Sequence, residues 1–314
     1  MASKHKIEFG IYLPQLQFGF EDIKTRVQHA DRLGFHSVWF MDHLYPPQMP
    51  GIPSFEAWTI VSALATCTER VRLGHLVLAN QFRHPAILAK MATSLDVISN
   101  GRLDLGIGTG SVPKEHAEFG IPFPPIKERS TRFEESLQII KAMFTQEKTT
   151  FHGEYFHLDN VPNLPQPAQK PNPPLLVGGG GEKYLLPLAA KYADIWNCPT
   201  YSLGEMERKI AVLHEECKRA GRDPAAIRIS EEAVLALAPS KKELDEVKAK
   251  ALRRYPGPGW SLEAGGFVGT PEDIVRTVQA KAKLGVTLFV FFLSDRGDPK
   301  TLDLLAKEVL PAFR

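Results

Sequence analysis

Four consecutive glycines, Gly178 to Gly181, are the first residues of this chain whose type and spacing indicate chemistry. They follow the apolar run Pro174–Val177 and lead into Glu182–Leu186, a sequence typical of a helix start. Glycine lets the backbone approach a ligand closely, and the free N–H groups of a first helical turn favour an anion. The pattern therefore indicates a phosphate-binding turn, although an isolated glycine run is also typical of a loop with positive φ angles.

Asp42 and His43 form the second candidate group, because they end a predicted strand over 37–41. A histidine can exchange a proton near neutral pH, and a carboxylate beside it could orient the ring. We therefore expect His43 to be catalytic and Asp42 to orient it. The alternative is that the pair caps a loop.

Other titratable residues give weaker signals. His75 alternates with apolar neighbours in a predicted strand, so it is either an interior histidine or a contact for the ligand. Glu115 and Glu118 follow the predicted fourth strand, and an exposed helix face is the expected place for both. Four further histidines lack metal-ligand partners at a suitable spacing and are predicted to be solvated, namely His84, His116, His152 and His157.

The composition excludes several function classes. The chain has 314 residues, of which 43% are hydrophobic, and its 38 basic and 36 acidic side chains leave a formal charge of +2. Without a dense basic run, neither nucleic acid nor a membrane surface is an expected partner. Three cysteines, with no CxxC pair, indicate neither a disulfide framework nor a zinc site. No signal peptide or membrane-length apolar run is recognised, so we expect a cytoplasmic protein.

Short apolar runs alternate with amphipathic helical stretches along the whole chain, which predicts one (β/α)₈ barrel domain over residues 1–314. The expected strands are 7–13, 37–41, 71–79, 102–108, 174–177, 193–197, 227–238 and 288–292. A proline-rich insertion over 147–173 precedes the fifth strand, and its part from 160 to 174 is expected to lie near the barrel mouth. Active sites of such barrels lie at the carboxyl ends of the strands, where the candidate residues should meet.

A family resemblance extends over most of the chain, and the segments that carry it include Phe35–His43, Val71–Gly74, Gly101–Gly110, Pro173–Gly181 and Glu308–Phe313. In order and spacing they resemble the bacterial luciferase-like oxidoreductases, whose barrels bind FMN or the deazaflavin coenzyme F420. Within that family, Phe119–Pro125 and the glycine run look most like the F420-dependent members.

The resemblance implies a flavin-type ring at the barrel mouth. Its phosphate would be held by Gly178, Gly179, Gly180 and Gly181, a non-prolyl cis peptide would join Leu76 to Val77 behind the ring, and Thr109 and Gly110 would contact the ring edge. Asp42 and His43 match family positions beside the ring. The resemblance also implies a homodimer.

One departure bears on the substrate. The sugar-phosphate dehydrogenases of this family carry an acidic catalytic residue after the Thr-Gly pair, whereas this chain has Ser111. A sugar phosphate is therefore not the expected substrate. We expect an F420-dependent oxidoreductase that exchanges a hydride with a small organic substrate. The alternatives are an FMN-dependent monooxygenase and a flavin-binding protein without turnover.

Overall fold

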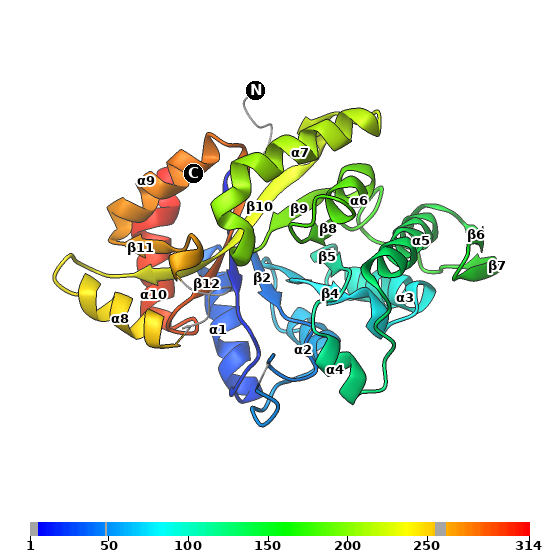
Figure 1. Cartoon of the computed structure of the whole chain (residues 1–314). Coiled ribbons are helices and arrows are strands. Elements are labelled where there is room, and N and C mark those ends of the chain that lie inside the picture. Colours follow the sequence, from blue (N-terminus) through cyan, green and yellow to red (C-terminus); the bar gives the residue numbers. More distant parts are fainter. Residues whose placement is uncertain (1–5, 48, 255–261) are drawn as a thin grey trace.

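The computed structural model describes residues 6–47, 49–254 and 262–314, and there it shows a closed parallel barrel with helices between the strands (Figure 1). Its strands are, in spatial order, β1 (Glu8–Tyr12), β2 (Ser37–Phe40), β3 (Arg72–His75), β5 (Leu103–Gly108), β8 (Leu175–Gly178), β9 (Ile195–Cys198), β10 (Arg228–Leu237) and β12 (Val286–Leu293). Strand β12 pairs with β1 and closes the ring. The predicted barrel and its eight strand positions are confirmed.

Strand β12 illustrates why these sequences form barrel strands. All eight of its residues are buried, as expected for a parallel strand covered on both faces. Leu288 and Val290 pack inside the barrel with Trp39, whereas Phe289 and Phe291 pack outward among residues of the helices. Successive side chains of a strand point to opposite faces, so each strand packs alternate residues into the barrel interior and against the helical layer.

The helical layer is formed by α1 (Phe20–Leu33), α2 (Ala57–Ala65), α3 (Pro85–Ile98), α5 (Ile126–Thr145), α6 (Leu185–Tyr192), α7 (Met206–Arg219), α8 (Leu244–Arg254), α9 (Pro271–Ala282) and α10 (Pro299–Leu304). Helix α1 ends at Gly34, whose φ of 80° suits a glycine, and α9 begins with a capping box of Thr270 and Asp273. No helix in these ranges is both long and apolar enough to cross a membrane.

Short elements complete the chain. Strand β4 (Leu78–Ala79) continues β3 and pairs with β5, and β11 (Phe267–Gly269) adds an unpredicted strand beside β10. The remaining short helical segments are η1 (Asn80–Phe82), α4 (Pro113–Glu118), η2 (Thr200–Glu205), η3 (Pro224–Ala226), η4 (Leu262–Ala264), the π-helical η5 (Leu305–Val309) and η6 (Leu310–Phe313).

The proline-rich insertion forms an antiparallel hairpin of β6 (Lys148–His152) and β7 (His157–Pro162), at the right edge of Figure 1. The part that follows does not lie near the mouth, so that expectation is wrong. Gln169 donates to the backbone oxygen of Leu103 at 2.8 Å and accepts from Arg72 at 2.9 Å, which places it at the starts of β5 and β3. Helix α5 carries the chain away from the mouth, and β8 begins at the end of the barrel opposite the mouth. The segment that leads into β8 therefore lies at that end.

Candidate active site

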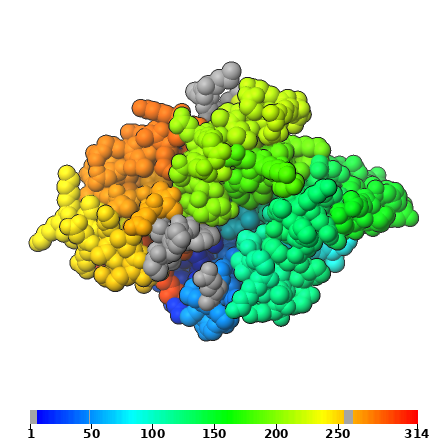
Figure 2. Space-filling view, viewed as in Figure 1, coloured from blue at the N-terminus to red at the C-terminus, as the bar shows by residue number. Residues whose placement is uncertain are grey.

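A cavity of about 360 Å³ lies at the carboxyl ends of the barrel strands. Figure 2 shows this face hollowed near its centre, between the teal residues of α4 and α5 and the yellow-green residues that follow β9. The predicted site residues all line the cavity: Asp42, His43, Leu76, Val77, Thr109, Gly110, Gly178, Gly179, Gly180 and Gly181. The fold thus brings together segments that are far apart in the sequence.

His43 is oriented by a carboxylate from α4. Its Nδ1 lies 2.9 Å from Oε2 of Glu115, and the backbone N–H of Leu44 donates to the other oxygen at 2.5 Å. A carboxylate acceptor favours the tautomer with the proton on Nδ1. Nε2 has no partner in the described part of the chain, and it is therefore the nitrogen available to exchange a proton with a ligand.

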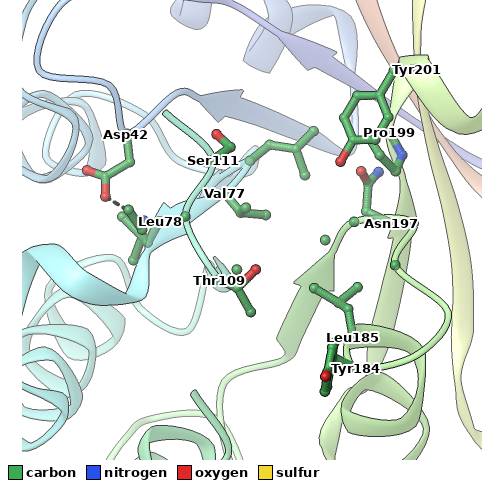
Figure 3. Close-up of a pocket in the computed structure, with 18 of the residues that line it drawn as sticks. Asp42, Val77, Leu78, Thr109, Ser111, Tyr184, Leu185, Asn197, Pro199 and Tyr201 are labelled. Carbon is green, nitrogen blue, oxygen red and sulfur yellow. Dashed lines mark hydrogen bonds between the residues drawn. The ribbon is translucent and has the colours of Figure 1, made fainter. Parts of the chain in front are cut away.

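Asp42 does not orient His43, which corrects the role expected for it. Its carboxylate accepts two hydrogen bonds from Arg83, at 2.8 and 2.9 Å, and one from the backbone of Ala79 at 2.9 Å. Strand β2 ends at Phe40, and beyond it the side chains of Asp42 and His43 meet different partners, Arg83 and Glu115. Figure 3 shows Asp42 at the edge of the site, bonded toward β4.

Asp42 and Arg83 belong to a partly buried ionic cluster that fixes the loop after β3. Arg83 also donates to Glu56 at 2.6 Å, and Glu56 caps the N-terminus of α2. Burial raises the pKa of the Asp42 carboxyl, while the hydrogen bonds from Arg83 oppose this effect. The cluster ties the end of β2 to β4 and α2, so Asp42 positions the cavity wall.

Two side chains of α4 lie where the sequence analysis did not place them. Glu115 and His116 are each only 1% exposed, so the expectations of an exposed face and a solvated ring are wrong. His116 packs between Phe82 and Phe123, at ring-centroid distances of 4.9 and 4.6 Å. Helix α4 packs into the mouth. The exposed positions of Glu118, His84, His152 and His157 are as expected.

His75 is an interior histidine that points away from the cavity. Its ring stacks on Trp58 at 5.1 Å, and its Nε2 lies 3.3 Å from the backbone oxygen of Ala57 in α2. Complete burial lowers the pKa of His75 to about 3, so the ring is neutral. Of the two interpretations that the sequence left open, the interior histidine is confirmed.

Val77 forms the wall on which a flat ligand could rest. The expected cis peptide between Leu76 and Val77 is present, and Val77 projects into the cavity in Figure 3. Glycines on the two neighbouring strands make room for it: a Cβ at Gly108 or Gly178 would lie 2.8 or 2.7 Å from a Val77 methyl group. These glycines are therefore needed for packing of the wall.

Thr109 and Gly110 follow β5 and bound the cavity beside Val77. Arg129 donates to both of their backbone oxygens, at 3.1 and 2.8 Å, and Gln81 donates to that of Thr109 at 2.6 Å. These bonds fix the turn, in which Gly110 adopts a φ of 74°. The Thr109 hydroxyl is left facing the cavity in Figure 3.

The glycine run forms a rigid cradle with free donors. The backbone N–H of Gly179 donates to the backbone oxygen of Asn197 at 3.1 Å. The side chain of Lys209, which is 7% exposed, donates to the backbone oxygen of Gly180 at 2.8 Å. The N–H groups of Gly180 and Gly181 bond to nothing within the described ranges. Helix α6 begins only at Leu185, so the turn itself supplies the free N–H groups.

The cradle fits a phosphate. A Cβ at Gly180 would lie 2.3 Å from the Ser202 hydroxyl oxygen, and Gly179 adopts a φ of 136°, so both positions require glycine. The free N–H groups of Gly180 and Gly181 favour an anion at this turn. The Lys209 ammonium fixes the turn and is paired with Glu182 and Glu205, at 3.3 and 3.4 Å. The residues present therefore match the phosphate of a flavin-type cofactor.

Sequence reasoning also missed Glu232, which lines the opposite side of the cavity on β10. The available signal was the pair of adjacent glutamates, Glu231 and Glu232, in a strand whose ten residues are all buried. Side chains alternate between the two faces of a strand, so one of the pair must point into the barrel. Asn197 lies on β9, the neighbour of β10, and Figure 3 shows it close to Tyr201.

Comparisons with known proteins agree with this geometry. A 180-residue segment is 36% identical to an F420-dependent glucose-6-phosphate dehydrogenase of Amycolatopsis mediterranei, covering 56% of this chain and 51% of that protein. An F420-dependent hydroxymycolic acid dehydrogenase of Mycobacterium tuberculosis is 28% identical over 97% of this chain and 88% of its own length.

A solved structure shares the fold. An F420-dependent secondary alcohol dehydrogenase in complex with an F420–acetone adduct superposes with a TM-score of 0.83 at 22% identity, covering 98% of this chain and 99% of that chain. The sequence profile of the luciferase-like monooxygenase family matches residues 5–288. The chain therefore belongs to the luciferase-like monooxygenase family.

Proposed function

We propose that this protein is an F420-dependent oxidoreductase that transfers a hydride between the coenzyme and a small alcohol or carbonyl compound. The observation that carries the proposal is that one cavity contains both the glycine cradle and the oriented His43. The F420-dependent relatives support the choice of coenzyme. Ser111, at the position of the acidic residue of the sugar-phosphate enzymes, argues against a sugar phosphate.

The described residues offer a place for each part of the coenzyme. We assign the phosphate to Gly178–Gly181, the face of the ring to Leu76 and Val77, and the ring edge to Thr109 and Gly110. A bound deazaflavin supplies a ring carbon that accepts or donates a hydride and reacts poorly with oxygen.

His43 handles the proton that accompanies the hydride. When an alcohol is oxidised, its hydroxyl proton leaves as the carbon–hydrogen bond is cleaved, and Nε2 of His43 accepts it. In the reverse direction the same nitrogen donates the proton to the carbonyl oxygen. Glu115 holds the ring in position, with its Oε2 2.9 Å from Nδ1.

Cofactor titration tests the proposal directly. The protein should bind F420 in preference to FMN, and with F420 it should oxidise a secondary alcohol without consuming oxygen. Binding of FMN with substrate-dependent oxygen consumption would instead support the monooxygenase alternative. Binding of either cofactor without turnover of any alcohol or ketone would support a flavin-binding protein.

Substitutions in the cradle should weaken cofactor binding. Gly180→Val places a side chain against Ser202 and displaces the turn, so we expect the dissociation constant of F420 to rise at least about tenfold, the effect of losing one to two charge-assisted hydrogen bonds. Gly204→Ala is the matched control, because a Cβ there meets no atom within 4 Å. Unchanged F420 affinity in folded Gly180→Val would remove the cradle from the cofactor site.

We also expect a homodimer, since closed twofold assemblies are the commonest soluble oligomers, and a cytoplasmic location in keeping with the free Cys67, Cys198 and Cys217. Sedimentation at micromolar concentration checks the first expectation; a monomer alone would contradict it.

A further inference from the structure

Glu232 is a carboxyl group in the cavity for which the chemistry above gives no role. Its residue is 2% exposed, and it shares the inner face of β10 with Val234 and Ala236. Three strands separate β10 from β3 in either direction around the ring, so Glu232 lies across the mouth from the Val77 wall. A ligand that rests on Val77 has Glu232 on its far side.

The carboxyl group of Glu232 lacks partners among the described residues. Its Oε1 is buried without a hydrogen bond, and neither oxygen forms an ion pair. The neighbouring Glu231 provides the contrast, because it points out of the barrel and pairs with Lys281 at 2.8 Å. Glu232 is thus a buried polar side chain directed into a cavity.

An unpaired buried carboxyl holds its proton. Burial raises the pKa of Glu232 to about 8, since no cation compensates the loss of water. Within the described ranges, the charge of Glu232 acts on the Cys198 thiol and the Tyr201 phenol, and Tyr12 lines the same cavity. Burial raises the pKa of Cys198 to about 12, Tyr201 is exposed, and His43 and Glu115 lie elsewhere in the cavity. At neutral pH Glu232 is therefore an uncharged group that can both donate and accept.

We propose that Glu232 binds a second, uncharged polar group of the substrate, remote from the reacting carbon, and selects against substrates that carry an anion there. This inference rests on the proposed function and narrows its substrate class to alcohols or ketones with a neutral amide, carbonyl or hydroxyl group. An amide suits the site because its N–H and C=O complement the O–H and C=O of a carboxylic acid. A carboxylate would lose its water in this buried part of the cavity, where no cation of the described residues pairs with Glu232, and it has no N–H to donate to the carboxyl oxygen.

The test uses three alcohols of nearly equal shape. 4-Hydroxypentanamide carries a neutral amide, 4-hydroxypentanoate a carboxylate, and 5-methylhexan-2-ol an apolar branch in the same place. With F420, kcat/KM should be highest for the amide and at least about tenfold lower for the carboxylate. Glu232→Met should lose about tenfold on the amide alone, and Glu232→Gln, which keeps a donor and an acceptor, should retain it.

Control variants distinguish substrate selection by Glu232 from effects on folding and on F420 binding. Glu231→Gln, a neighbouring buried carboxyl that faces away from the cavity, should leave the preference among the alcohols unchanged. All variants should bind F420 as the wild type does. A fall in F420 affinity in both Glu232 variants would assign the residue to the coenzyme and overturn the proposal, as would an unchanged preference for the amide in Glu232→Met.

Two readouts do not depend on turnover. The infrared difference between wild type and Glu232→Gln at pH 7 should contain a protonated carboxyl band, which shifts when 4-hydroxypentanamide is added. The native state holds a proton that the unfolded chain releases above its ordinary pKa of 4.5, so the Tm of wild type should fall relative to Glu232→Gln between pH 4.5 and about 8. Absence of the band, or a band that the amide does not shift, would overturn the proposal even if F420 is reduced.

Discussion

His43→Ala is expected to bind F420 nearly as well as the wild type but to turn over on the order of 10²- to 10⁴-fold more slowly, the range typical of a general acid or base. The reason is that Nε2 is the unpartnered nitrogen of a ring whose Nδ1 is bonded to Glu115. Coenzyme titration and steady-state kinetics with a secondary alcohol measure the two effects separately.

His43→Asn provides the comparison, because the amide keeps some hydrogen bonding but cannot exchange a proton near neutral pH. It should be almost as slow as His43→Ala. Equal losses in F420 affinity and in rate would make His43 a coenzyme contact. Full activity in His43→Ala would refute the assigned mechanism.

Glu115→Gln is expected to lower kcat by on the order of 10- to 10³-fold with little effect on F420 affinity. The wild-type carboxylate accepts from both the His43 ring and the Leu44 N–H. A glutamine has one acceptor oxygen, so its NH₂ group would face one of these donors and the ring would lose its fixed orientation. Steady-state kinetics over a range of pH measures the loss.

Asp42→Asn distinguishes the role of Asp42 from that of Glu115, since only Glu115 orients His43 in the structure. Its main effect should be on stability, a loss of about 1 to 3 kcal/mol in urea unfolding, because Arg83 loses the charge of Asp42 but keeps its ion pair with Glu56. A larger loss of kcat in Asp42→Asn than in Glu115→Gln would contradict this assignment.

The barrel was predictable from the sequence because local patterns determine it. Apolar runs such as 286–293 identify strands wherever they occur, and the glycine and capping signals at Gly34 and Thr270 mark helix ends without reference to the rest of the fold. The residues at the strand ends were predictable for the same reason, because the fold class fixes the end at which a cavity forms.

Side-chain partners were less predictable because tertiary packing decides them. His43 and Glu115 are 72 residues apart, and no periodicity links them. The adjacent Asp42 suggested a pairing with His43, but its carboxylate binds Arg83 instead. Glu232 was missed because a charged residue in a strand is usually assigned to solvent. The course of residues 160–174 depends on where α5 ends, which composition does not indicate.

The most direct test of the account is the transfer of a deuterium label. The protein is mixed without oxygen with oxidised F420 and with 5-methylhexan-2-ol or 4-hydroxypentanamide deuterated at the carbinol carbon, and the coenzyme is examined by mass spectrometry and NMR. The account predicts reduced F420 with a single deuterium on its ring carbon and the matching ketone in equal amount. F420 that remains oxidised with both alcohols, while FMN supports oxygen-consuming turnover of either one, would contradict it.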